Sequence, residues 1–244
     1  MRILPLLALP LILTAATADN DTDRGPGIAG ERQGDVTNYR AGDFAKVAYG
    51  VPGAVEIRVG PAWSVRATGP AAAFANLRVT NERGTLQIDH RYRDRKTDDA
   101  LERQVHFTIT VPQLTAVALG GSGRMTVDRV SGAAFDAAVG GSGSLALGSI
   151  AVERAEVSIG GSGDVTASGS ARNLSVNLGG SGSFDAPGLR AAGAEIASAG
   201  SGRIRTTVDG SAQVSLVGSG SIDLGPNARC SVSRMGSGQV RCAP

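Results

Sequence analysis

Serines are the residues of this chain whose number and spacing most invite a chemical interpretation. Seven stand between two glycines: Ser122, Ser142, Ser162, Ser181, Ser201, Ser219 and Ser237. A nucleophilic serine needs a base beside it, and the Gly-x-Ser-x-Gly elbow of hydrolases needs a glycine two residues after the serine. Arg124 and Asp164 occupy that position in two units. Seven equivalent serines therefore indicate a structural ladder, and no catalytic residue is predicted among them.

Carboxylates and arginines alternate at one repeated position. Five residues after the first glycine of successive units stand Asp185, Arg205, Asp223 and Arg241. We interpret this series as an exposed charge ladder that fixes register between stacked strands. Asp185 and Asp223 could also form a catalytic pair, but neighbouring arginines would keep both ionised, which suits no general acid.

A charge-dense loop runs from His90 to Asp99. Arg91, Arg93 and Arg95 could recognise an acidic sugar, because a guanidinium matches the geometry of a carboxylate. The alternative is a solvated loop between strands. His90 and His106 flank this loop, and each is expected to be a surface or capping residue.

Metal and phosphate chemistry find no support in the glycine-rich units. Gly160–Asp164 is similar to a calcium-binding nonapeptide, but that motif must recur every nine residues to complete its oxygen cage. The residues equivalent to Asp164 are Arg124, Ser144, Ser183, Arg203, Ser221 and Gln239. No Lys-Ser or Lys-Thr follows the glycines, as a phosphate-binding loop would require. We predict no metal and no cofactor.

The spacing of the Gly-Ser-Gly units predicts the elements that carry them. Their first glycines are 20, 20, 19, 20, 18 and 18 residues apart, a period typical of repeat proteins. Apolar residues recur two and four positions before that glycine and four and six after it, which predicts two half-buried strands per repeat. Four positions before it stand Val117, Ala137, Val157, Val176, Ile196, Val214 and Val232.

Two short strands cannot bury their apolar faces alone, so the repeats must stack. We predict an all-β parallel β-helix, or solenoid, with coils about 4.8 Å apart. About seven regular coils would occupy residues 114–244, with Gly-Ser-Gly at a corner, and no helix is expected in 115–244. In residues 43–113 apolar and polar residues alternate without the Gly-Ser-Gly period. We interpret this segment as irregular coils that cap the same β-helix domain, which would span residues 43–244. A separate small β domain is the alternative.

One outward position of the predicted coils carries only small side chains. Three residues before the first glycine stand Ala118, Ala138, Ser158, Asn177, Ala197, Ser215 and Ser233. This strip is either a solvated sheet surface or a docking surface for a second subunit or for a polymer laid along the axis.

The chain begins with a pattern typical of a secretory signal. Arg2, the apolar run Ile3–Leu13 and the small residues at 16–18 predict a signal peptide over residues 1–18. Residues 19–42 are polar and glycine-rich, which predicts a flexible leader. We therefore expect an exported protein, periplasmic, secreted or at the cell surface, without a transmembrane segment in the mature chain.

Charge and cysteine content agree with export. The formal net charge is +2, which gives no electrostatic case for nucleic acid as a partner. Cys230 and Cys242 lie six residues before and six after the last first glycine. In an oxidising compartment we expect them to form one disulfide that closes the terminal coil.

The order of these segments resembles a bacterial family. The segments are Phe44-Ala-Lys-Val-Ala-Tyr, Ala54-Val-Glu-Ile-Arg-Val-Gly, Trp63-Ser-Val, Thr85-Leu-Gln-Ile and Phe107-Thr-Ile-Thr-Val-Pro-Gln-Leu, followed by the Gly-Ser-Gly units. Residues 43–225 are thereby similar to the auto-transporter adhesin head GIN domain, DUF2807. The resemblance implies a right-handed β-helix exported by bacteria, with adhesin-like or glycan-binding roles and no established catalytic residues. A lipoprotein cysteine found in many relatives is missing here, which leaves the mode of surface attachment open.

Together these patterns favour a non-catalytic, exported, adhesin-like binding or scaffold module, with a polysaccharide of the cell envelope or the exterior as its partner. A homo-oligomer formed through the small-residue strip is a further expectation. The alternatives are a polysaccharide-processing β-helix enzyme, which would need converging carboxylates in one groove, and a purely structural envelope protein.

Overall fold

The computed structural model of the chain describes residues 26–91 and 99–243, and it is nearly all β. The first strands are β1 (Gly30–Gln33), β2 (Val36–Tyr39), β3 (Lys46–Tyr49), β4 (Ala54–Val59), β5 (Ser64–Thr68), β6 (Leu77–Glu82), β7 (Thr85–His90) and β8 (His106–Val111). Two single-turn helices, η1 (Ala71–Phe74) and α1 (Asp99–Glu102), lie between them. Both precede the region in which no helix was expected.

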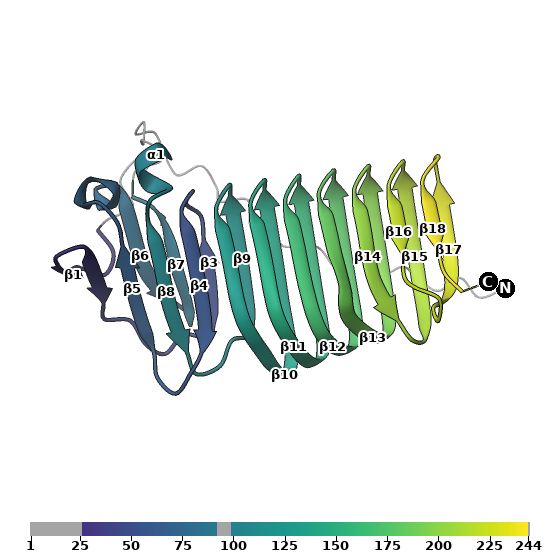
Figure 1. Ribbon diagram of the computed structural model, residues 1–244, viewed down its shortest axis with the longest axis horizontal. Helices are drawn as coiled ribbons and strands as arrows, with labels where there is room; N and C mark the ends of the chain where they lie inside the picture. Colours follow the sequence, from purple (N-terminus) through teal and green to yellow (C-terminus); the bar gives the residue numbers. More distant parts are fainter. Residues whose placement is uncertain (1–25, 92–98, 244) are drawn as a thin grey trace.

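The repeats form a parallel β-solenoid of about six turns, where about seven were expected. Its strands are β9 (Ala116–Gly121), β10 (Arg124–Gly141), β11 (Ser144–Gly161), β12 (Asp164–Gly180), β13 (Ser183–Gly200), β14 (Arg203–Val208), β15 (Ser211–Gly218), β16 (Ser221–Asp223), β17 (Arg229–Met235) and β18 (Gln239–Arg241). They stand side by side along the long axis of the molecule (Figure 1). The long strands β10 to β13 each run from one Gly-Ser-Gly corner to the next and pair in parallel with the following coil.

Equivalent residues of successive coils lie directly over one another. The column from Val117 to Val232 is paired in register through every coil, as the period predicted. Its members are buried up to Val214, whereas Val232 is 47% exposed. Val232 is exposed because no strand among the described residues pairs with the outer side of β17.

Each full coil has three straight stretches, not the two that the pattern predicted. Between β10 and β11 the paired register skips Asp128 and Ala133, and residues 129–132 form the middle stretch between these two bends. Its inward residues include Val130 and, one coil on, Ile150, and both are buried. The sequence did not predict this stretch because it is only about four residues long, too short to show a clear alternation of apolar and polar residues.

Close backbone approach fixes the Gly-Ser-Gly corner. Gly161 has a φ of 108°, a region that favours glycine, and a Cβ built there would lie 2.7 Å from the carbonyl oxygen of Gly141. At the same corner the Ser162 amide donates a hydrogen bond of 2.9 Å to that oxygen. The corner therefore continues the interstrand hydrogen bonding only when glycine stands first.

This contact makes Gly161 sensitive to the smallest substitution. Gly161→Ala should lower the free energy of unfolding by about 1–3 kcal/mol, because alanine is strained at this φ and its Cβ clashes with the preceding coil. Chemical denaturation of the variant and of Ser162→Ala would measure the difference. Ser162 is exposed, so its truncation should change stability by less than about 0.5 kcal/mol. Equal effects of the two substitutions would contradict this account of the corner.

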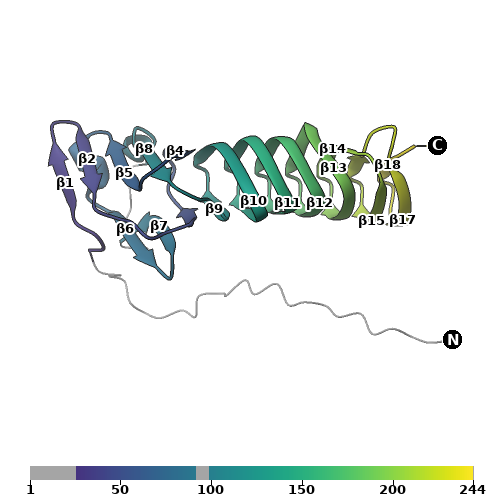
Figure 2. The same ribbon diagram turned by 90° about the horizontal axis from the view of Figure 1, so that it is seen from below.

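The irregular coils share one sheet and one hydrophobic core with the regular ones. β3 and β4 pair in parallel with β9 and β10 and so continue the two sides of the solenoid. Farther out the pairing becomes antiparallel, through β8, β5, β2 and β1 on one side and through β7 and β6 on the other. Figure 2 shows these antiparallel strands at one end and the successive turns following them.

The prediction of a flexible leader over residues 19–42 is wrong for the second half of that segment. β1 and β2 lie within it as an antiparallel hairpin, and β2 also pairs with β5. The strands were missed because they are only four residues long and because β1 is exposed throughout, so it has no buried face to produce alternation. The predicted signal peptide, residues 1–18, lies outside the described residues.

The predicted disulfide between Cys230 and Cys242 is present, with their Cα atoms 6.1 Å apart. It joins β17 to the residue after β18 and so links the two sides of the terminal coil. Among the described residues this coil has a neighbour on one side only, so it depends on the crosslink more than the inner coils would.

Loss of this disulfide should therefore destabilise the terminal coil. A crosslink that closes a loop of about this length contributes about 2–3 kcal/mol. Cys230→Ser/Cys242→Ser should lower the unfolding free energy by this amount, measured by denaturant titration. Dithiothreitol should reproduce the loss in the unmodified chain and have no further effect on the double variant. The prediction is wrong if the double variant and the reduced, unmodified chain both unfold at the same denaturant concentration as the oxidised, unmodified chain.

Candidate functional site

The structure describes one of the three arginines predicted to bind an acidic sugar. Arg91 follows β7, is partly buried, and its amide donates a 2.8 Å hydrogen bond to the Asn76 carbonyl oxygen. Arg93 and Arg95 lie outside the described residues. Recognition of an acidic sugar by the three arginines thus stays a prediction.

His90 has a partner that the sequence did not reveal. Its Nε2 lies 2.8 Å from Oε2 of Glu102, whose side chain is buried in α1. Burial, and to a lesser degree the Glu102 charge, raise the pKa of the nearby Tyr49 hydroxyl. Glu102 was missed because a glutamate in a charge-dense stretch is normally solvated. The pair lies within the capping end, away from the regular coils.

The corner serines form an exposed row along one edge of the solenoid. Backbone amides of Ser142, Ser162, Ser181, Ser201 and Ser219 donate to carbonyl oxygens of the preceding corner. Among the described residues, one pair of corner hydroxyls is within hydrogen-bond distance, Ser219 and Ser237 at 3.1 Å. No histidine of the described chain bonds to any of them. This arrangement suits a structural ladder.

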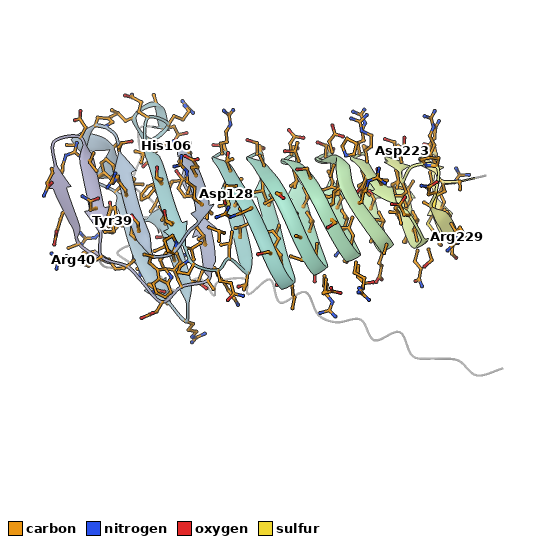
Figure 3. The ribbon with its side chains drawn as sticks, turned by 60° about the horizontal axis from the view of Figure 1, so that its bottom comes forward. Tyr39, Arg40, His106, Asp128, Asp223 and Arg229 are labelled. Carbon is orange, nitrogen blue, oxygen red and sulfur yellow. A yellow bond between two sulfur atoms is a disulfide. The ribbon has the colours of Figure 1, made fainter. Side chains whose placement is uncertain are left out.

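The charge ladder is paired in the register that the sequence predicted. Arg205 donates to both carboxylate oxygens of Asp185, at 2.7 and 3.0 Å. Asp223, labelled near the carboxyl-terminal end in Figure 3, accepts a 3.1 Å hydrogen bond from the Gly225 amide. An arginine thus separates the two aspartates, so they do not form the adjacent pair that acid–base catalysis would use.

Most other carboxylates on the solenoid also have a partner. Glu153 lies 2.7 Å from Nε of Arg172 in the next coil. Hydrogen bonding from Asn227, and then the Arg190 charge, hold the pKa of the Asp209 carboxyl below its usual value. Asp128 accepts the Val59 amide where β4 meets the first regular coil (Figure 3). Pairing between coils is thus the common state of acidic residues here.

The small-residue strip lies on a hollowed outer surface. We name the outward surface of β9, β10, β11, β12, β13, β15 and β17 the small-residue face. A hollow of about 800 Å³ lies on it, and the residues that line it include Gly140, Gly160, Gly179 and Ala197. Volumes of this size are typical of ligand sites. Because these side chains are so short, the sheet itself is accessible to a ligand.

Three acidic residues stand beside this hollow, five positions before the first glycine of their units. Asp136, Glu156 and Glu195 form this acidic column, and all three are exposed. Asp136 is paired in register with Glu156, so two like charges face each other on neighbouring strands. In the described chain none of the three makes an ion pair or a side-chain hydrogen bond. The sequence alone did not single out these residues, although their common position in the repeat could have done so.

Like charges opposite each other destabilise a sheet. Asp136→Asn/Glu156→Gln should therefore raise the free energy of unfolding by a few tenths to about 1 kcal/mol, and the gain should shrink with added salt. Glu153→Gln/Asp209→Asn makes the same change in net charge but removes paired carboxylates, so it should leave stability unchanged or lower it. Thermal unfolding at two salt concentrations would compare the pairs. A loss of stability in the first variant would show that these carboxylates have a stabilising partner.

Metal-ligand clusters and membrane-spanning helices were sought in residues 26–91 and 99–243. No group of three histidine, cysteine or acidic side chains there is arranged to hold a metal ion. None of the helices in these ranges has the length and apolarity needed to cross a membrane.

Comparison with known proteins identifies the family. Residues 43–228 match the model of DUF2807, described as "Putative auto-transporter adhesin, head GIN domain". The chain belongs to this family. The resemblance noted from the sequence is thereby confirmed. A search of curated proteins finds no match to the chain.

Solved structures show the same fold. A crystal structure of a "putative adhesin" from Bacteroides fragilis has a TM-score of 0.74 at 23% identity, covering 85% of this chain and 95% of that one. A "putative lipid binding protein" from Parabacteroides distasonis has a TM-score of 0.67 at 20% identity, with coverages of 91% and 98%. A "putative adhesin" from Parabacteroides merdae has a TM-score of 0.59 at 16% identity, with coverages of 91% and 100%. The names in the family and among these neighbours are those of binding proteins, not of enzymes.

Proposed function

We propose that this chain is a non-catalytic, exported, adhesin-like module that binds an extended polysaccharide of the cell envelope or the exterior. The observation that carries the proposal is the hollow of about 800 Å³ on the small-residue face. This hollow extends over β10, β11, β12, β13 and β15 and follows the stacking axis, so a chain-like ligand can lie along it.

The chemistry of the small-residue face suits a sugar chain. A pyranose ring presents an apolar surface of C–H groups and a rim of hydroxyls. The floor of backbone, glycine and alanine can contact the ring surface, while Ser158, Asn177 and Ser215 offer hydrogen-bonding groups in the same hollow. The coils repeat every 4.8 Å or so, and a repeating surface can bind several units of a repeating polymer.

Binding without catalysis is favoured over the enzyme alternative. The carboxylates of the charge ladder are separated by Arg205, and within the described residues no histidine bonds to a corner serine. The family name and the Bacteroides fragilis neighbour's name describe adhesins. The lipid-binding name of one neighbour makes an acyl chain in the hollow the second candidate, because the hollow is lined mainly by apolar atoms.

A glycan-array measurement on residues 19–244 tests the proposal, with Ala197→Tyr as the decisive variant. The tyrosine would fill the hollow, so binding of the captured glycan should fall by about tenfold or more. Thr166→Tyr also introduces a tyrosine, at an exposed position on another side of the solenoid, and should leave binding unaltered. Sizing of the purified protein should accompany the array, since self-association through the small-residue face would hide the hollow.

The proposal fails if the array captures nothing while the protein is folded and monomeric. Capture by phospholipid vesicles in place of glycans, abolished by Ala197→Tyr, would favour the acyl-chain alternative. A dimer that Ala197→Tyr dissociates would favour the structural alternative.

A further inference from the structure

The last coil of the solenoid has one unpaired edge. β17 pairs with β15 and β18 pairs with β16, and within the described residues neither has a strand on its outer side. These two strands end the row in Figure 1. An unpaired edge presents backbone N–H and C=O groups to which a further strand can bond. A further coil would lie about 4.8 Å beyond it.

Apolar side chains are exposed at this edge. Val232 is paired in register with Val214, which is buried, but Val232 itself is 47% exposed. Met235, on the same strand, is 72% exposed. A strand added beside β17 would cover Val232 in the way that β17 covers Val214, so this edge has apolar surface for a partner to bury.

The charged side chains of the last coil are all cationic. Residues 224–243 contain three arginines and neither aspartate nor glutamate. Arg229, Arg234 and Arg241 are exposed, and none of them forms an ion pair within the described residues. Figure 3 labels Arg229 at this end of the molecule. Arg234 is paired in register with the buried Leu216, and its guanidinium donates a 3.1 Å hydrogen bond to the Gly238 carbonyl oxygen. A partner at this edge therefore meets positive charge on both phases of β17.

The charge ladder indicates which sign of charge the next strand should carry. Asp185, Arg205, Asp223 and Arg241 are paired in register and alternate in sign. Arg241 is the last member, so it faces a carboxylate on one side only. Opposite charges on facing residues stabilise neighbouring strands, and like charges destabilise them. The group that continues this pattern is a carboxylate.

We propose that this edge binds an extended acidic segment of a partner polypeptide, which adds a strand beside β17. In complexes of this kind backbone hydrogen bonds to the free edge provide affinity and side-chain contacts provide specificity. Carboxylates of the segment form charge-assisted hydrogen bonds with Arg229 and Arg234, and an apolar residue between them covers Val232. The inference does not depend on polysaccharide binding, because neither arginine lines the hollow at Ala197.

The charges disfavour a second copy of this chain as the partner. Two terminal edges brought together would set arginine against arginine. The opposite end of a second copy presents β1, whose sequence Gly-Glu-Arg-Gln has no apolar side chain to cover Val232. Glu31 of that strand is also already paired with Arg40, at 2.9 Å. Arginines on the edge thus discourage pairing between copies and leave the edge open to an acidic strand.

An NMR titration of the full chain with a capped peptide, Glu-Thr-Thr-Val-Thr-Glu-Val, tests the proposal. In parallel pairing with β17, the direction that the coils use, its two glutamates face Arg229 and Arg234 and its first valine faces Val232. Amide shifts should change along β17, and the peptide should bind about tenfold or more tightly than the same peptide with glutamine in place of glutamate. N-methylation of the peptide amides that face β17 should abolish binding, because it removes the hydrogen bonds of the added strand.

Two variants with the same change in net charge locate the site. Arg229→Gln/Arg234→Gln should give the glutamate and glutamine peptides equal affinity. Arg172→Gln/Arg203→Gln alters exposed positions on inner coils and should retain the tenfold preference. Added salt should weaken binding of the glutamate peptide more than that of the glutamine peptide.

Three results would overturn the proposal. The first is equal affinity of the unmodified chain for the two peptides, or no shift change along β17. The second is binding that survives N-methylation, or an oligomer of glucuronic acid bound as tightly with the same dependence on Arg229 and Arg234, since either indicates a general anion-binding surface. The third is a dimer on sizing that Val232→Asp dissociates, which would assign the edge to a second copy.

Discussion

The close approach of one backbone to the next at each corner is the constraint on which the rest of this molecule depends. From Gly141 onward, a Cβ on the first glycine of a unit would lie 2.3–2.7 Å from the carbonyl oxygen of the equivalent glycine one coil earlier. That separation leaves room for a hydrogen and for nothing larger. Glycine at this point lets the chain turn and still donate its next amide to the preceding coil, so the coils stay in register.

Register converts a sequence period into columns with distinct chemistry. The column through Val157 and Val176 is apolar throughout and buried up to Val214, and the one through Asp185 and Arg205 alternates in charge and lies outside. The acidic column is a third kind, in which Asp136 faces Glu156 and neither forms an ion pair within the described residues. A solenoid therefore distributes its chemistry in rows along an axis, and this form of surface suits a ligand that is itself a row of similar units.

The two ends of the solenoid are finished differently. At the amino-terminal end the parallel coils give way to antiparallel strands, and the outermost, β1, is fully exposed and carries Glu31, which pairs with Arg40. Charges on an outer strand discourage further pairing. At the other end a disulfide holds the last coil, while Val232 remains half exposed. The hollow proposed to bind a polysaccharide lies between these ends, on strands that are paired with the coils on both sides.

The sequence alone predicts much of this architecture. The Gly-Ser-Gly period, the apolar positions around it and the spacing of Cys230 and Cys242 are local or strictly repeated features, and a strict repeat predicts that equivalent residues stack. The tertiary structure alone decided the rest. The middle stretch at 129–132 and the hairpin of β1 and β2 are too short, and β1 too exposed, to produce a periodic signal. The contact of His90 with Glu102 depends on how two separate elements pack, which no local pattern specifies. The same holds for the acidic column, because whether a carboxylate is paired depends on distances to other side chains, and the repeat shows only that Asp136 and Glu156 occupy equivalent positions.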